Sequence, residues 1–150
     1  MFEPTSSSGW HLSRRERICL AVLGLVLLGL LGIAGGLKPD PSGLGTHQQL
    51  GLPPCTVLSM FGIRCPACGM TTSWAYFVRG HWLAAGEANA GGALLAFSAG
   101  VGGLWFVGSA VRGRWIVTRP ADWIVLLYCT SILLVTLVHW LIRIVPDIWR

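Results

Sequence analysis

The sequence predicts an all-α integral membrane protein with three transmembrane helices, because apolar residues are abundant and gathered into long runs. Hydrophobic residues make up 53% of the chain and charged residues 11%, whereas soluble domains carry about 25% charged residues. Three uncharged runs, at residues 18–37, 90–111 and 123–142, reach the roughly 20 residues that a helix needs to cross a bilayer. The chain is expected to divide into an N-terminal segment, residues 1–17, and a single membrane domain, residues 18–150.

The first run begins directly after three arginines and contains no charge up to Leu37. It is longer than the apolar core of a signal peptide, about 7–15 residues, and no good cleavage site follows it. We therefore expect an uncleaved membrane anchor. Gly32 and Gly36 stand four residues apart, a spacing of small residues that lets two helices approach closely.

The second and third runs carry their own packing and interface signals. Gly92, Ala96 and Gly100 form a stripe of small residues in the second run, which predicts a helix-packing face. Trp123 and Trp140 lie about 25 Å apart along an ideal helix, a distance that fits the two aromatic belts of a bilayer.

Arginine clusters predict the orientation of these helices. Three arginines precede the first span, and three more stand in the short connection between the second and third spans, whereas the loop at residues 38–89 holds three Lys and Arg residues spread widely. Basic residues close to the membrane favour the cytoplasmic side. The N-terminus is therefore predicted to be cytoplasmic and the loop external. The net charge of +5 forms no basic stripe interleaved with aromatics, which argues against nucleic-acid binding. The clustered arginines are Arg14, Arg15, Arg17, Arg112, Arg114 and Arg119.

The loop at residues 38–89 is too long and too apolar for a plain linker. We expect a helix to begin at Cys65, with Pro66 in the first turn and Gly80 at its end. About 14 residues of helix cover roughly 21 Å, which is less than the hydrocarbon thickness. The prediction is a short interfacial or re-entrant helix after the Cys-Pro-x-Cys motif.

The five cysteines fall into two groups by expected depth. Cys55, Cys65 and Cys68 share the external loop, whereas Cys19 and Cys129 lie toward the cytoplasmic ends of their spans. A disulfide requires Cα atoms within about 7 Å, so neither Cys19 nor Cys129 is expected to pair with the loop. Both are interpreted as small buried hydrophobic residues.

Three interpretations of the loop cysteines remain open. A disulfide would staple the loop in an oxidising compartment. A zinc ion would use Cys55, Cys65 and Cys68, with His47 or His81 as the fourth ligand. A redox site would use Cys65 and Cys68, with Cys65 as the attacking thiol because the helix N-terminus favours its thiolate.

The motif Cys-Pro-Ala-Cys-Gly-Met-Thr resembles a family of small bacterial membrane proteins of unknown function, whose pattern is Cys-Pro-x-Cys-Gly-x-Thr-Arg with a cysteine some ten residues upstream. The resemblance implies a bacterial cytoplasmic (inner) membrane and supplies no activity. Thr72 replaces the usual arginine, and Ala90 replaces the proline that usually follows the asparagine. The matching residues are Cys55, Cys65, Pro66, Cys68, Gly69, Thr71, Gly80 and Asn89.

Two hypotheses of function follow. The favoured one is a non-enzymatic membrane subunit or assembly factor, whose external loop, stapled by a disulfide or held by a metal, docks a partner membrane protein or a second copy of the chain. The alternative is an envelope thiol-disulfide oxidoreductase that uses Cys65 and Cys68. The latter would need a second dithiol or a quinone to pass electrons onward.

Overall fold

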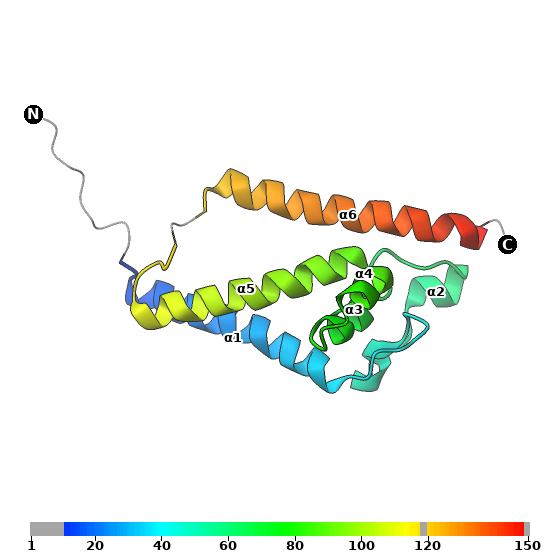
Figure 1. Ribbon diagram of the computed structural model, residues 1–150, viewed down its shortest axis with the longest axis horizontal. Coiled ribbons are helices and arrows are strands. Elements are labelled where there is room, and N and C mark those ends of the chain that lie inside the picture. Colours follow the sequence, from blue (N-terminus) through cyan, green and yellow to red (C-terminus); the bar gives the residue numbers. More distant parts are fainter. Residues whose placement is uncertain (1–10, 118–119, 149–150) are drawn as a thin grey trace, which may run out of the picture.

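The computed structural model describes residues 11–117 and 120–148, and this part of the chain is built of helices (Figure 1). Residues 1–10 of the expected N-terminal segment, and Arg119 of the expected basic connection, lie outside the described residues. The elements in chain order are α1 (Arg14–Gly36), η2 (Thr46–Leu50), α2 (Thr56–Phe61), α3 (Met70–Phe77), α4 (Trp82–Ala88), α5 (Ala90–Arg112) and α6 (Asp122–Ile148).

Three of these helices, α1, α5 and α6, are long and apolar enough to cross a membrane. Their outward faces carry many exposed leucines, isoleucines and valines, as expected for helices whose solvent is lipid. Shorter helices lie between α1 and α5 in the chain. The predicted fold class is therefore confirmed, and the chain has the features of a multi-pass membrane protein in contact with lipid.

The helices α1 and α5 form an antiparallel pair that is joined at one end and splayed at the other (Figure 1). At the joined end the Leu12 N–H donates to the Gly113 carbonyl at 2.9 Å. At the splayed end α3 and α4 fill the space between the two long helices, and α3 contacts both of them. This wedge carries the cysteine motif at its outer edge.

Close packing of α1 on α5 uses glycines other than those predicted in α1. A Cβ atom on Gly24 would lie 2.7 Å from Val107 Cγ2 and 2.8 Å from the Gly103 carbonyl oxygen, so only glycine fits there. In contrast, a Cβ on Gly32 or Gly36 would have no neighbouring atom within 4 Å in the described chain. Gly32 and Gly36 therefore point away from α5, although Leu31 beside Gly32 still lies near Gly100.

The small-residue stripe on α5 follows a spacing of four, three and four residues. Gly92, Ala96, Ala99 and Gly103 are all buried. Gly100, predicted from a uniform four-residue spacing, is half-buried, and a Cβ there would make ordinary contact with Leu31 at 3.7 Å. A helix has 3.6 residues per turn, so a strict spacing of four drifts away from the contact face.

Three arginines donate hydrogen bonds to the C-terminal carbonyls of helices distant in the sequence. These carbonyls have no partner within their own helix and carry the negative end of its dipole, so a cation there is favourable. The three guanidinium groups thus hold separate helix ends together. The bonds run from Arg17 to Ala110 of α5 at 2.9 Å, from Arg79 to Gly35 of α1 at 2.9 Å, and from Arg143 to Ala88 of α4.

The helix α6 lies beside α5 and contacts it (Figure 1). The Tyr128 hydroxyl lies 2.5 Å from the Ser98 hydroxyl, and Thr136 packs directly on Gly91. Farther along α6, the Trp140 indole N–H donates to the Arg64 carbonyl at 2.5 Å. This last contact places α6 against the residue that precedes Cys65.

Candidate cysteine centre

The Cys-Pro-Ala-Cys segment is a tight turn, and the helix that follows it begins at Met70 rather than at Cys65. Within the turn the Cys68 N–H donates to the Cys65 carbonyl at 3.0 Å. Gly69 then has φ +85°, a left-handed conformation that stops a continuous helix and favours glycine. Its Cα faces the Ala88 carbonyl so closely that no side chain fits. The predicted helix start is therefore wrong, and Cys65 does not occupy a helix N-terminus.

Asn89 fastens this turn to the start of α5. Its amide group donates to the Pro66 carbonyl at 3.0 Å and to the Cys68 carbonyl at 3.2 Å. Its side-chain oxygen accepts from the Gly92 N–H at 2.8 Å, which caps α5. Asn89 is 2% exposed, so these three bonds are made away from water and fix the geometry of the turn.

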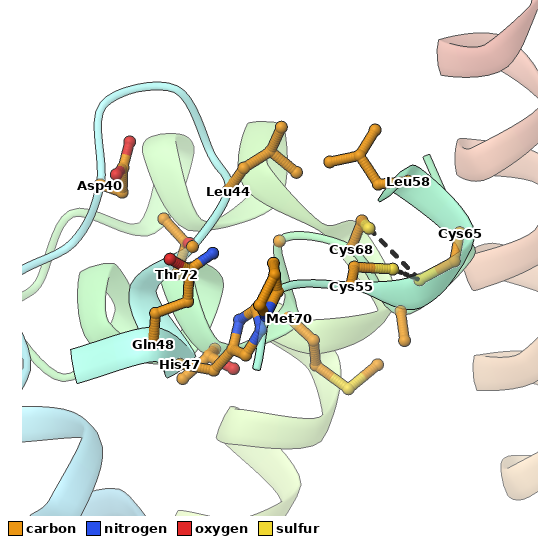
Figure 2. A pocket seen from close by; sticks show the side chains of 15 residues that line it. Asp40, Leu44, His47, Gln48, Cys55, Leu58, Cys65, Cys68, Met70 and Thr72 are labelled. Carbon is orange, nitrogen blue, oxygen red and sulfur yellow. Dashed lines mark hydrogen bonds between the residues drawn. The ribbon is translucent and has the colours of Figure 1, made fainter. Parts of the chain in front are cut away.

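The three loop cysteines meet at one place, although they come from two segments. Figure 2 shows Cys55 approaching Cys65 and Cys68 across the end of the pocket. Cys65 lies in the middle, because its Sγ is 3.5 Å from that of Cys55 and 3.3 Å from that of Cys68. All three Sγ atoms lie within 4.8 Å of one another. The expected approach of Cys55 to the pair is confirmed.

The two outer thiols of this cluster have different environments. Burial raises the pKa of Cys68 to about 12, and the neighbouring Cys65 thiol acts in the same direction. For Cys55, the Leu58 backbone N–H lowers the pKa by favouring the thiolate, while partial burial opposes it. In a cluster of free thiols, the negative charge would therefore reside on Cys55 before Cys68.

A pocket of about 530 Å³ opens beside the sulfurs and is lined by all three cysteines (Figure 2). Its other walls come from η2, from the loop before it and from the start of α3. Thr46 and Thr72 are buried there, and their hydroxyl oxygens lie 2.7 Å apart. Asp40 also lines the pocket, and bonds from the Ser42 hydroxyl and backbone N–H hold the pKa of its carboxyl below the usual range.

The two predicted histidines have different positions. His47 stands in the wall of the pocket, with its Nε2 atom 3.1 Å from the Pro53 carbonyl. His81 precedes α4, is exposed and packs its ring edge-on against Tyr76. Among the described residues, the compact cluster of potential ligand atoms contains the three cysteines and neither histidine.

Cys19 and Cys129 are exposed on α1 and α6 rather than buried, so that interpretation is wrong. Both helices are mostly uncovered, and a small apolar side chain is equally suited to lipid.

Two supporting contacts of the centre were not predicted from the sequence. The Trp140–Arg64 bond joins residues 76 positions apart, and Trp140 had been interpreted only as an interfacial aromatic. Asn89 stood out as a match to the resembling family, and its place before an apolar run is typical of a helix N-cap. No local signal indicates that its amide also holds the turn.

Comparison with known proteins agrees with the resemblance found in the sequence. The family described as "Protein of unknown function (DUF2752)" matches residues 55–102, about a third of the chain. The match begins at Cys55 and includes the Cys-Pro-Ala-Cys turn, Asn89 and the first half of α5. The chain is thus similar to a family of unknown function in the region that builds the cysteine centre. No curated protein and no solved structure matches the chain.

Proposed function

We propose that this chain is a non-enzymatic membrane subunit or assembly factor whose cysteine loop docks a partner membrane protein. The observation that carries the proposal is the apolar surface on the loop outside the three long helices. Met60 is 70% exposed and Phe61 is 68% exposed, and Leu50 and Leu52 are also exposed. We call these four residues the loop patch. Exposed apolar groups of this kind mark sites that contact a protein or a membrane.

The architecture around the loop patch supports a rigid docking element. Cys55 immediately precedes α2, whose last residues are Met60 and Phe61. The turn at Cys65 is fastened to α5 by Asn89 and to α6 by Trp140. A surface next to a fastened turn loses less conformational entropy on binding than a free loop would, which favours affinity. The partner is another membrane protein or a second copy of this chain.

The proposed location is the bacterial cytoplasmic membrane, with the N-terminus in the cytoplasm and the cysteine loop outside. The joined end of α1 and α5 supports this orientation, because it gathers five arginines at one end of the bundle. Helix carbonyls engage Arg17 at this end and Arg79 and Arg143 at the other. The gathered arginines are Arg14, Arg15, Arg17, Arg112 and Arg114.

Site-specific photo-crosslinking in native membranes tests the docking proposal. A photoreactive residue at Met60 or Phe61 should give a protein adduct, whose mass identifies a partner or a second copy. Leu104 on α5, which is 67% exposed on a spanning helix, is the matched control and should give lipid adducts. If positions 60 and 61 also yield only lipid adducts, the loop patch is a membrane anchor and the proposal fails.

A second candidate function is thiol-disulfide exchange, favoured by the central position of Cys65. From a Cys65–Cys68 disulfide, the Cys55 thiolate could attack Cys65 Sγ, which forms a Cys55–Cys65 bond and releases the Cys68 thiolate. Net oxidation of a substrate dithiol would pass two electrons and two protons to the protein disulfide and then to a quinone or a second disulfide. Burial raises the pKa of Cys68, which makes it a poor leaving group, so this function ranks second.

Replacement of Cys68 by serine separates the two candidates. For a structural centre, Cys68→Ser should lower the amount of protein in the membrane. For an oxidoreductase, the protein level should be unchanged, and oxidation of a substrate dithiol should be lost, because the Cys65–Cys68 disulfide that accepts its electrons cannot form. Cys129→Ser, outside the loop, should do neither.

A further inference from the structure

The arrangement of the three loop sulfurs fits one shared ion better than any pairwise bond. A disulfide can join only two of them, and it would leave the third thiol beside the bridge. Around a tetrahedral zinc ion, with zinc–sulfur bonds of about 2.3 Å, neighbouring thiolate sulfurs lie about 3.8 Å apart. The observed separations are 3.5 Å and 3.3 Å from Cys65 to its two neighbours, and every pair lies within 4.8 Å. Small side-chain adjustments would bring all three onto one ion.

We propose that Cys55, Cys65 and Cys68 bind one zinc-class divalent ion, and that its fourth coordination position opens into the adjoining pocket. Thiolates are soft ligands that select zinc over magnesium or calcium. The cysteines themselves form one wall of the pocket of about 530 Å³, so an ion among them would face that space. A site with three protein ligands and an open position binds an exchangeable ligand. The centre belongs to the loop itself and does not require a docked partner.

The surroundings hold the ligands in place before the ion arrives. The Pro66 and Cys68 carbonyls are fixed by Asn89, and the Arg64 carbonyl is fixed by Trp140. These bonds to the backbone at residues 64–68 limit the movement of the Cys65 and Cys68 side chains. Such outer contacts orient metal ligands and commonly affect affinity by about 10- to 100-fold when they are removed.

His47 contributes a hydrogen-bonding group to the wall of the same pocket. The Pro53 carbonyl can only accept a hydrogen bond, so Nε2 of His47 carries the proton in this contact. In the neutral ring Nδ1 then keeps its lone pair. His47 shares the pocket with the three cysteines, so it can bind a water or a small ligand held by the ion.

The first test is the metal content and thiol state of the full-length protein, purified in detergent without reductant or chelator. Native mass spectrometry should show one zinc ion per chain. The three loop thiols should resist maleimide until a chelator is added. The Cys19→Ser/Cys129→Ser double variant, which keeps the centre, should retain one ion. If the protein lacks zinc and its loop thiols are released by a reductant instead of a chelator, the centre is a disulfide and the proposal is overturned. This readout requires no replacement of a loop cysteine.

The second test uses cobalt, which reports the ligands through its absorption spectrum. In the cobalt protein, Cys55→Ser should reduce the thiolate-to-cobalt absorption by about one third, because two thiolates remain of three. An unchanged absorption would exclude Cys55 from the centre and overturn the three-thiolate assignment. Added imidazole should shift the cobalt bands of the unmodified protein by entering the open position. A spectrum that does not respond to imidazole would show a closed site and overturn the open position.

Discussion

Asn89 shows how one polar side chain can serve two structures at once. Its oxygen caps α5, while its amide nitrogen holds two carbonyls of the Cys-Pro-Ala-Cys turn. Both tasks lie in a buried environment, where an unsatisfied polar group is costly. The position of Asn89 in the chain therefore has to suit both its bonds to the turn and its cap of α5.

Replacing Asn89 by alanine should destabilise the protein more than the loss of an ordinary helix cap. The lost cap costs about 1 kcal/mol, and carbonyls left buried without a partner add about 1–3 kcal/mol. We expect a lower unfolding midpoint in detergent and faster maleimide labelling of Cys68 in metal-free, reduced protein, since Cys68 is buried in the intact structure.

The control for this variant is Ser13→Ala, which removes the exposed cap of α1 and its bond from the Glu16 N–H. It should cost about 1 kcal/mol or less and leave Cys68 as protected as before. Equal effects of the two variants would mean that the amide bonds of Asn89 contribute nothing to the turn.

At the scale of helices, the contact between α1 and α5 depends on Gly24, which lies directly against α5. Gly24→Ala should destabilise the pair by about 1–3 kcal/mol, as overpacking does in cores. The added Cβ would lie 2.8 Å from the Gly103 carbonyl oxygen, a backbone atom that cannot rotate away. Gly29→Ala makes the same change in the same helix, where no atom lies within 4 Å, and should be neutral. The unfolding midpoints of the two variants are compared in detergent. Similar midpoints would mean that the contact between α1 and α5 does not require glycine at position 24.

The existence of the long helices was predictable from the sequence, but their contact faces were not. An uncharged run fixes the length of a membrane helix, since the bilayer sets it. It does not fix which side faces a neighbour, because lipid and protein contacts are both apolar. Gly32 and Gly36 matched the spacing for packing, yet Gly24 makes the contact, because Gly24 lies on the face of α1 that meets α5 and the other two do not. Tertiary packing also explains why α3 begins at Met70, later than the sequence predicts. Proline at position 66 favours a helix start, but tertiary packing on Ala88 selects a left-handed glycine at position 69.

At the scale of the whole molecule, arginines gather at the joined end of α1 and α5. Arg14, Arg15, Arg17, Arg112 and Arg114 lie there, and each end has an arginine that donates to helix carbonyls, Arg17 at the joined end and Arg79 at the other. Arginines near the membrane hold their end in the cytoplasm. The gathered arginines are therefore the feature on which the proposed orientation rests.

Fusions to a reporter that is active only outside the cytoplasmic membrane test the orientation. A fusion after Gly45, in the cysteine loop, should be active, and one after Gly113, at the joined end, should be inactive. A cytoplasm-dependent reporter at the same two positions should give the opposite pattern. Activity of the external reporter after Gly113 but not after Gly45 would reverse the assignment.

The candidate centre was predictable only in part, because its parts come from distant segments. The three cysteines were identifiable from their spacing and their shared loop. The different positions of His47 and His81 depend on how η2 and α4 pack, which no local pattern encodes. The contact from Trp140 depends on the last helix of the chain.

That last contact has a consequence for the order in which the protein matures. During synthesis the cysteine loop emerges well before α6, and Arg143 and Trp140 are 55 and 76 residues distant from their acceptors. Until α6 inserts, Asn89 holds the Cys-Pro-Ala-Cys turn of the nascent loop, but the bonds from Trp140 and Arg143 have not yet formed. The loop thiols of a ribosome-bound chain are therefore more accessible than those of the finished protein. A factor that loads an ion or oxidises the cysteines would reach them most easily in this interval, and insertion of α6 would then cover the completed centre.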